Sequence, residues 1–348
     1  MKTMRFLAIA LSTSLFFASC TEDNDNNNDG DDNPTTNDVA QLYASNNSNG
    51  NITVYNLAAN PVETKTLLTA SLAAEGIYYD ATTDLVVQAS RSFNQLNAYG
   101  SISTTGSNTT ATLLFSGNVD LSSPRDIAVN GNTYVVSDNT DLNLDADPNT
   151  TENRYFIYTK SGNNFVLRNT VTVNFPVWEI TFVGNDLYGV VDKSSDLVKF
   201  ENFVSLNTTN AVVEPTKRIT VQGIVRTHGL TFDGGTLVMT DIGDAMSDSD
   251  GAFQIITDFK AKFDATAANG MLSLSDQLRY DGASSGLGNP VSVDFDSESS
   301  TVYIAEAANE GGRILIFNKA ALSRDTGNFG PSSSFALTQA SSVYFYKD

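Results

Sequence analysis

The chain has very few of the residues that cross-link small secreted domains or bind transition metals. Its 348 residues include one cysteine and one histidine. A single cysteine excludes a disulfide framework and a cysteine-based zinc site, and a single histidine excludes centres built from several histidines. Basic residues are also scarce, because 20 Lys and Arg face 40 Asp and Glu and give a formal net charge of −20. Such a chain would repel phosphate backbones, so we expect no nucleic-acid partner.

Apolar residues, in contrast, are abundant enough to build a core. They make up 41% of the chain, whereas charged residues make up only 17%. This balance excludes intrinsic disorder for most of the sequence. We therefore expect an acidic globular domain.

The first twenty residues have the features of an export signal. Lys2 and Arg5 precede an apolar run over residues 6–18, which is too short to span a bilayer comfortably. The only cysteine then ends the segment Phe17-Ala18-Ser19-Cys20, which resembles a bacterial lipobox. The resemblance implies that residues 1–19 are a lipoprotein signal peptide and that Cys20 carries lipid, such as palmitate, that anchors the protein to a membrane. An ordinary secretory signal followed by a chance cysteine is the alternative.

Residues 20–38 are predicted to be a disordered tether between the lipid and the domain. The run 21–34 is rich in Asp and Asn and has no apolar side chain that could pack in a core. Acidic residues directly after a lipidated cysteine resemble the surface-export signal of Bacteroidota lipoproteins. This implies an outer-membrane protein exposed at the cell surface, with periplasmic retention as the alternative. Calcium capture by these acids is a second interpretation, although a run without a glycine-punctuated turn is more typical of a solvated linker.

Residues 39–348 repeat one pattern of short strands. Strand-like runs that begin at Gly76, Asp126, Glu179, Gly229 and Ser292 each precede a turn, a second strand and a third strand. They recur at intervals of about 50 to 60 residues, which is the period of a β-propeller blade with inserted loops. We place the blades near 39–73, 76–121, 126–174, 179–223, 229–283 and 292–338.

The two ends of this region complement each other. Residues 42–46 and 52–55 look like a second and third strand without a first, and residues 342–346 look like a first strand with nothing after it. The C-terminal strand should therefore complete the N-terminal blade and remove the open sheet edge. The sequence predicts an all-β fold, a six-bladed β-propeller closed in this way; a β-sandwich or a solenoid is the alternative.

The repeated unit, clearest over 126–158 and 292–317, resembles that of NHL-repeat and gluconolactonase-type propellers. Gluconolactonase-type propellers hold a metal ion with residues directly before the first-strand glycine. The matching positions here are Glu75, Arg125, Trp178, His228 and Val291. Only Glu75 matches by type, and His228 is the other residue of this set that could ligate a metal.

Three long insertions fall between second and third strands, at 138–154, 241–252 and 306–313, and so on one face of the predicted ring. The first contains oxygen-bearing side chains at the spacing of an EF-hand loop, where alternating oxygens surround one Ca²⁺. These candidate ligands are Asp141, Asn143, Asp145, Asp147, Asn149 and Glu152. Ala146 stands where an EF-hand has glycine, and a solvated acidic loop is the alternative to structural calcium.

Polar residues also recur at the ends of the second strands, near the expected mouth of the channel. They are Asn46, Asp138, Asp192, Asp241 and Glu306. Carboxylates around one mouth would favour a cation or a cationic group, whereas turn initiation by Asp explains the same pattern without a ligand.

These observations favour a surface- or periplasm-facing lipoprotein that acts as a binding or assembly module. Its partner would be a protein or a glycan of the cell envelope, bound through the face with the inserted loops. The alternative is a metal-dependent lactonase or hydrolase of the gluconolactonase type, with Glu75, His228 and Asp241 around a central ion. His228 would then be a candidate general base.

Overall fold

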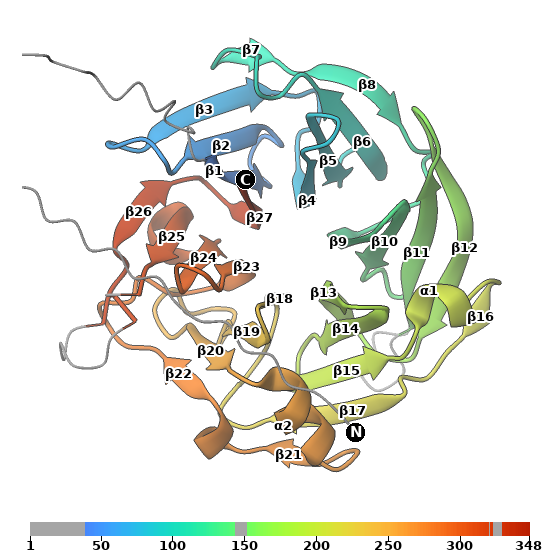
Figure 1. Ribbon diagram of the computed structural model, residues 1–348, viewed down its shortest axis with the longest axis vertical. Helices are drawn as coiled ribbons and strands as arrows, with labels where there is room; N and C mark the ends of the chain where they lie inside the picture. The colour runs from blue at the N-terminus through green and yellow to red at the C-terminus, as the bar shows by residue number, and fades with distance from the viewer. Residues whose placement is uncertain (1–38, 143–151, 320, 323–328) are drawn as a thin grey trace, which may run out of the picture. The chain divides into compact units, whose positions relative to one another are not determined.

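The computed structural model describes residues 39–142, 152–319, 321–322 and 329–348, and these form six β-sheets in a ring around a central channel (Figure 1). The fold is a six-bladed β-propeller, as the repeats predict. The expected signal peptide, Cys20 and the acidic tether lie outside the described residues. So do four residues of the predicted calcium loop: Asn143, Asp145, Asp147 and Asn149.

Each blade is an antiparallel sheet whose first strand lies beside the channel and whose fourth strand lies towards the rim. Blade 1 consists of β27 (Ala340–Lys347), β1 (Ala40–Asn46), β2 (Ile52–Asn56) and β3 (Glu63–Leu68). Blade 2 consists of β4 (Ala74–Asp80), β5 (Leu85–Ser90), β6 (Gln95–Gly100) and β8 (Thr112–Ser116). Blade 3 consists of β9 (Pro124–Asn130), β10 (Thr133–Asp138), β11 (Asn153–Lys160) and β12 (Phe165–Val173).

The second half of the ring follows the same plan. Blade 4 consists of β13 (Val177–Val183), β14 (Asp186–Val191), β15 (Asp196–Phe200) and β17 (Lys217–Val221). Blade 5 consists of β18 (Leu230–Asp233), β19 (Thr236–Asp241), β20 (Ala252–Ile256) and β22 (Leu278–Tyr280). Blade 6 consists of β23 (Pro290–Asp296), β24 (Thr301–Glu306), β25 (Arg313–Phe317) and β26 (Ser333–Ala336). The helical segments of the described chain are short: α1 (Phe203–Leu206), α2 (Phe259–Ala265), η1 (Leu274–Asp276) and η2 (Asn309–Gly311).

The C-terminal strand closes the ring. β27 is the innermost strand of blade 1 and pairs antiparallel with β1, with Ala40 opposite Lys347 and Tyr43 opposite Tyr344. The prediction that the C-terminal strand completes the N-terminal blade is thus confirmed. Because β27 pairs with β1, the inner edge of blade 1 is no longer open to another chain.

Aromatic side chains join blade 1 to both of its neighbours. Tyr43 stacks on Tyr79 of blade 2 with ring centroids 4.3 Å apart, and Phe345 stacks on Tyr303 of blade 6 with centroids 4.7 Å apart. Burial of one such side chain contributes roughly 1.5–3 kcal/mol. In β27, Val343 is buried and Tyr344, Phe345 and Tyr346 are partly buried, so the strand contributes roughly a few kcal/mol to the stability of the ring.

The rim contains elements that the repeats do not predict. Every blade has a fourth strand, and three two-residue strands lie beyond it: β7 (Thr109–Thr110), β16 (Ala211–Val212) and β21 (Met271–Leu272). Each of these belongs to the connection between the third and fourth strands of one blade and pairs in parallel with the outer strand of the preceding blade. They cover part of the free outer edges of those sheets.

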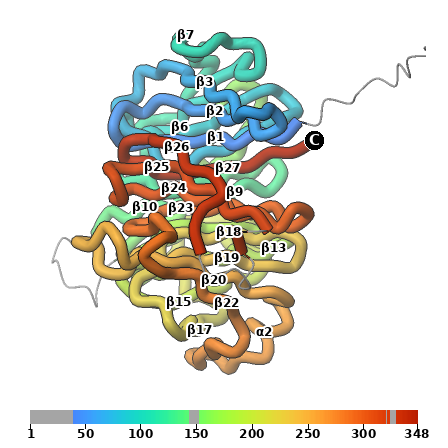
Figure 2. Tube along the Cα trace, turned by 90° about the vertical axis from the view of Figure 1, so that its left-hand side faces the viewer, coloured from blue at the N-terminus to red at the C-terminus, as the bar shows by residue number. Residues whose placement is uncertain are grey.

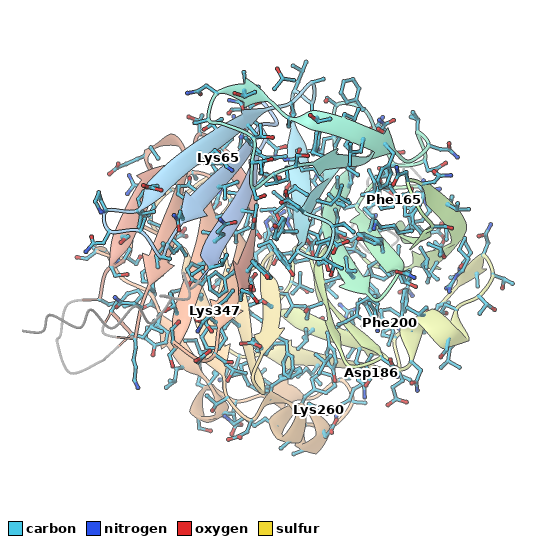
Figure 3. The ribbon with its side chains drawn as sticks, turned by 45° about the horizontal axis from the view of Figure 1, so that its top comes forward. Lys65, Phe165, Asp186, Phe200, Lys260 and Lys347 are labelled. Carbon is cyan, nitrogen blue, oxygen red and sulfur yellow. The ribbon has the colours of Figure 1, made fainter. Side chains whose placement is uncertain are left out.

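The two faces of the ring differ. Second strands end and third strands begin on one face, which we call the loop face, and the three insertions predicted from the sequence lie there. The connections between third and fourth strands, which include α1 and α2, lie on the opposite face. The other face, which we call the turn face, carries both ends of the described domain, where Asp348 N donates to Val39 O at 3.0 Å. Figure 2 shows the ring edge-on, with the C-terminus on one side of it, and Figure 3 shows the side chains that cover the ring. In the described chain no helix is long and apolar enough to cross a membrane.

Candidate functional site

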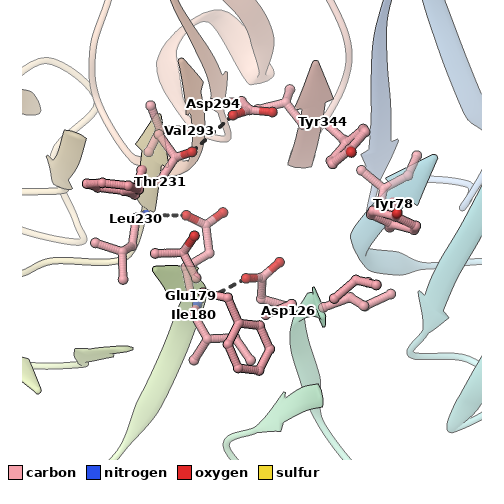
Figure 4. Close-up of a pocket in the computed structure, with 17 residues that line it drawn as sticks. Tyr78, Asp126, Glu179, Ile180, Leu230, Thr231, Val293, Asp294 and Tyr344 are labelled. Atoms are coloured by element: carbon pink, nitrogen blue, oxygen red, sulfur yellow. Dashed lines mark hydrogen bonds between the residues drawn. The ribbon is translucent and has the colours of Figure 1, made fainter. Parts of the chain in front are cut away.

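The innermost strands line a central channel that contains a cavity of about 240 Å³ (Figure 4). Asp126 of β9, Glu179 of β13 and Asp294 of β23 line this cavity, together with Tyr78 and Tyr344. At the level of Asp126 the aligned residues are Gly or Ser in four blades and acidic in two, and at Gly76 the neighbouring backbone approaches too closely for a side chain. A Cβ atom at Gly76 would lie 2.7 Å from the Cα atom of Asp126.

The three channel carboxylates are bonded to the backbone of the next blade. Asp126 Oδ2 accepts a hydrogen bond from Ile180 N at 3.0 Å, and Glu179 accepts one from Leu230 N. Asp294 Oδ2 accepts from Phe345 N at 2.6 Å. These N–H groups lie on the inner edges of the sheets, where no further strand can pair with them, so the acids satisfy donors that would otherwise be buried without partners.

Burial dominates the protonation of these groups. It raises the pKa of Asp126 to about 7 and that of Asp294 to about 6, although both accept backbone hydrogen bonds that act in the opposite direction. Burial, reinforced by the neighbouring charge of Asp126, raises the pKa of Glu179 well above its ordinary value. The channel therefore holds carboxyl groups that retain protons near neutral pH.

At the loop-face end of the channel, side chains from four neighbouring blades form a continuous chain of contacts. Arg125 Nη1 lies 3.0 Å from Glu75 Oε1, and the Arg125 guanidinium lies over the Trp178 ring at 4.1 Å from its centroid. The Trp178 ring in turn stacks on His228 with centroids 3.6 Å apart. Both faces of the indole are thus covered, and it offers no stacking surface to a ligand.

Further polar residues complete this assembly at its two ends. Arg91 Nη1 lies 3.3 Å from Glu75 Oε1. Arg226 binds Asp192 through Nε and Nη2, at 2.7 and 3.1 Å, and His228 Nε2 lies 3.0 Å from Asp192 Oδ1. We call the following residues the mouth cluster: Glu75, Arg91, Arg125, Trp178, Asp192, Arg226 and His228.

The charges of the mouth cluster are set by burial and by these contacts. Burial raises the pKa of Glu75 in spite of two adjacent guanidinium groups. Burial lowers the pKa of His228 in spite of Asp192, so the imidazole is neutral at pH 7. For Asp192 burial acts to raise the pKa, but the bonds from His228 and Arg226 outweigh it and hold the pKa well below its usual range.

The five residues predicted at the channel mouth all lie at the loop-face ends of second strands, and all are buried. Apart from Asp192, they bond mainly to backbone amides of the loops on this face, both their own loop and the connection that leads into the first strand of the same blade. Asp138 Oδ2 accepts from two backbone amides at 2.7 and 2.9 Å, and Glu306 accepts from four, at 2.8 to 2.9 Å. Asp241 accepts from three backbone amides and from Arg279, and Asn46 caps the turn that follows it. Their visible role is to fasten the loops.

Of the three residues predicted around a central ion, Glu75 and His228 both belong to the mouth cluster but bond to different partners, and Asp241 is not part of the cluster. Glu75 is held by arginines, His228 by Asp192 and Trp178, and Asp241 by Arg279. Among the residues that the structure describes, no group of three His, Cys, Asp or Glu side chains is arranged to hold a metal ion. The donor set therefore does not fit a gluconolactonase-type centre, and we derive no step through such an ion.

Of the predicted calcium ligands, only Asp141 and Glu152 lie within the described chain. They stand at the base of the insertion, where Leu142 N donates to Glu152 O at 3.1 Å. This bond brings the two ends of the insertion together. The calcium prediction itself rests on residues outside the described chain.

Sequence reasoning did not identify Arg91, Arg226 or the channel acids as parts of one site. The sequence does contain a pattern that could have identified the channel acids. In the aligned innermost strands, Asp126 and Glu179 occupy a position at which the other repeats have Gly or Ser. A charged residue at a position where the repeat otherwise keeps small side chains indicates a channel-lining role.

Comparison with known proteins identifies the fold. No family model and no curated protein matches the sequence. A chain of a nidogen/laminin complex matches with a TM-score of 0.55 and 14% identity, covering 88% of this chain and 98% of that one. Two proteins described as putative 6-phosphogluconolactonases also match. The one from Bacteroides uniformis has a TM-score of 0.56, 12% identity and coverage of 89% and 100%; the one from Bacteroides fragilis has values of 0.55, 11%, 90% and 99%. At these identities the similarity establishes the propeller fold, which hosts many functions.

Proposed function

We propose that this protein is a lipid-anchored lipoprotein of the outer membrane that binds a protein or a glycan of the cell envelope through its loop face. The observation that carries the proposal is that this one face combines the inserted loops, exposed apolar side chains and the arginines of the mouth cluster. The lipid anchor at Cys20 and the surface location come from the sequence alone.

The loop-face end of blade 2 supports binding of a partner. Its three loop tips lie side by side, because Leu72 N donates to Ser92 Oγ at 2.9 Å and Leu121 N donates to Asn94 O at 3.0 Å. They expose the apolar side chains of Leu72, Phe93 and Val119. Single exposed apolar residues need no explanation, but three on adjoining tips beside Arg91 match the composition of a recognition surface.

The direction of the chain also suits this function. The described domain begins at Val39 on the turn face, beside the C-terminal Asp348. A chain that carries a lipid upstream of Val39 would therefore join the domain on the turn face. The point at which an anchored chain would join the described domain therefore lies away from the loop face.

Site-specific photo-crosslinking in intact cells tests this proposal. A photoreactive amino acid replaces Leu72 on the loop face or, as the matched control, the exposed Lys260 of α2 on the turn face. We expect a discrete crosslinked species, protein or glycan, from position 72 and none from position 260. Crosslinks confined to position 260 would contradict the proposal.

A lactonase-type hydrolase acting in the channel is the second candidate. The observation that favours it is that Asp126 and Glu179 line the cavity with raised pKa values, which suits general acid–base groups. Two structural neighbours are described as putative 6-phosphogluconolactonases. The test is hydrolysis of gluconolactone by the wild type and by Asp126→Asn. A rate above the spontaneous one that the substitution abolishes would support this candidate, and no hydrolysis would reject it.

A further inference from the structure

The mouth cluster contains more positive than negative charge. The guanidinium groups of Arg91, Arg125 and Arg226 are paired with only two carboxylates, Glu75 and Asp192. The arginine side chains retain exposures of 33%, 13% and 26%, whereas each carboxylate is 3% exposed. The mouth cluster therefore carries one more positive than negative charge, in a chain whose formal net charge is −20. Partly exposed arginines are common binding groups for planar anions such as carboxylates.

Buried polar atoms without partners lie in and beside the same cluster. Arg125 Nε is a buried donor without an acceptor among the described residues. Two buried acceptors are also unpaired there, Asn47 Oδ1 and His228 Nδ1. The His228 atom is an acceptor because Asp192 can only accept, so the proton of the neutral ring lies on Nε2. Asn47 belongs to this site because its Nδ2 donates to Glu75 Oε1 at 2.8 Å.

These unpaired atoms define what a ligand would have to supply. The free donor and the excess positive charge require an anionic acceptor, and the two free acceptors require hydroxyl donors. We infer that the mouth cluster binds a hydroxylated monocarboxylate, the chemistry of a uronic acid, with its carboxylate among the arginines and its hydroxyl groups donating to Asn47 and His228. This inference rests on the proposed function, since it names the ligand chemistry of the loop face.

The charge count favours a carboxylate over a phosphate. A phosphate monoester carries about −1.5 to −2 charges at pH 7, which exceeds the one uncompensated positive charge of the cluster, whereas a carboxylate matches it. A hydroxyl group of a neutral sugar could accept from Arg125 Nε, but the excess positive charge would stay uncompensated.

Titration calorimetry of the purified domain tests this inference with D-glucuronate, D-glucose and inorganic phosphate. We expect glucuronate to bind at least ten-fold more tightly than either of the others. Arg91→Gln and Arg125→Gln should each weaken glucuronate binding ten-fold or more, with an unchanged circular dichroism spectrum. Lys193→Gln, which removes an exposed positive charge from the same face, should change it less than two-fold. If Arg125→Gln does not fold, the more exposed Arg91→Gln alone decides.

Each outcome bears on the inference. Equal affinity for glucuronate and glucose, equal affinity for phosphate, or an equal loss in Lys193→Gln would overturn it. The length of the ligand distinguishes two sources of the carboxylate. If a uronate trisaccharide binds more tightly than glucuronate, the ligand is part of a glycan; if the two bind with equal affinity, the ligand is a free sugar acid. If the photoreactive residue at position 72 crosslinks a partner but the protein does not bind glucuronate, this inference is refuted and the proposed function is not. If the protein binds glucuronate but crosslinks form only from position 260, the proposed function is refuted and this inference is not.

Discussion

Replacing Asp126 by asparagine should stabilise the propeller at alkaline pH and much less at acidic pH. Asp126 lies fully buried in the channel, where burial raises its pKa from 3.8 to about 7. A group whose pKa is raised on folding contributes its stability below the unfolded pKa and loses it as the pH rises through the folded pKa. The wild type should therefore lose stability between about pH 4 and 7, and the buried charge should cost it most above pH 7.

The size of the effect follows from the shift. One pKa unit corresponds to about 1.4 kcal/mol, so a shift of about three units makes the ionised form cost up to about 4 kcal/mol at pH 8. Asparagine keeps an oxygen that can accept from Ile180 N, so the backbone bond need not be lost. We expect Asp126→Asn to raise the free energy of unfolding by up to about 4 kcal/mol at pH 8 and by up to about 1.6 kcal/mol at pH 5, where the unfolded carboxyl group is already ionised but the folded one is not.

Urea unfolding followed by the fluorescence of Trp178, the only tryptophan, measures both values. The difference between variant and wild type at each pH cancels the contribution of His228, whose lowered pKa acts in the opposite direction as the pH falls. Asp264→Asn, which removes a charge from the exposed surface of α2, is the control. Equal effects of Asp126→Asn at pH 5 and pH 8, or destabilisation at pH 8, would refute the assignment of a buried, proton-retaining carboxyl group.

Three further predictions follow from the closure, the insertion and the N-terminus. A chain that ends at Gln339 lacks β27 and should show no cooperative unfolding transition as a monomer when it is followed by circular dichroism. A chain that lacks only Lys347 and Asp348 should keep the transition. A monomer without β27 that unfolds cooperatively would contradict the role of this strand in closing the ring. Calcium should raise the melting temperature relative to chelator, and Asp145→Ala should abolish the rise; identical melting in both conditions would remove the calcium site. Cys20→Ser should abolish incorporation of labelled palmitate and release the protein from the membrane fraction, and unchanged labelling would argue against the lipobox.

The ring could be predicted from sequence because its determinants are local and repeated. The aliphatic residues at one position of each innermost strand, such as Ile77, Ile127 and Ile180, recur with the period of the blade. The N-terminal end of the domain lacks a first strand and the C-terminal end has a first strand without the others. Pairing of these two ends, which closes the ring, is therefore the expected arrangement. The outer strands are less regular, because they face solvent on the rim and carry a weaker pattern, and the repeats did not reveal them.

The site was less predictable because it forms between blades. Glu75 and Arg125 are 50 residues apart and meet only through the register of adjacent sheets. Turn chemistry and ligand chemistry also use the same residue types. Asp241 looks like a ligand in the sequence, yet its Oδ1 accepts from the amides of Val225 and Arg226, both at 3.0 Å. The sequence shows that an acid follows the strand, and only the structure shows where its oxygens are used.

Hydrogen–deuterium exchange of the lipid-anchored protein in outer-membrane vesicles tests most directly whether the loop face is the binding face. Exchange is compared with that of the purified domain, peptide by peptide. We expect added protection over 69–73, 91–94, 117–123 and 222–229 on the loop face, and none over 257–266 on the turn face. Protection confined to 257–266 would contradict the proposal, because the turn face would then be the face that contacts a partner.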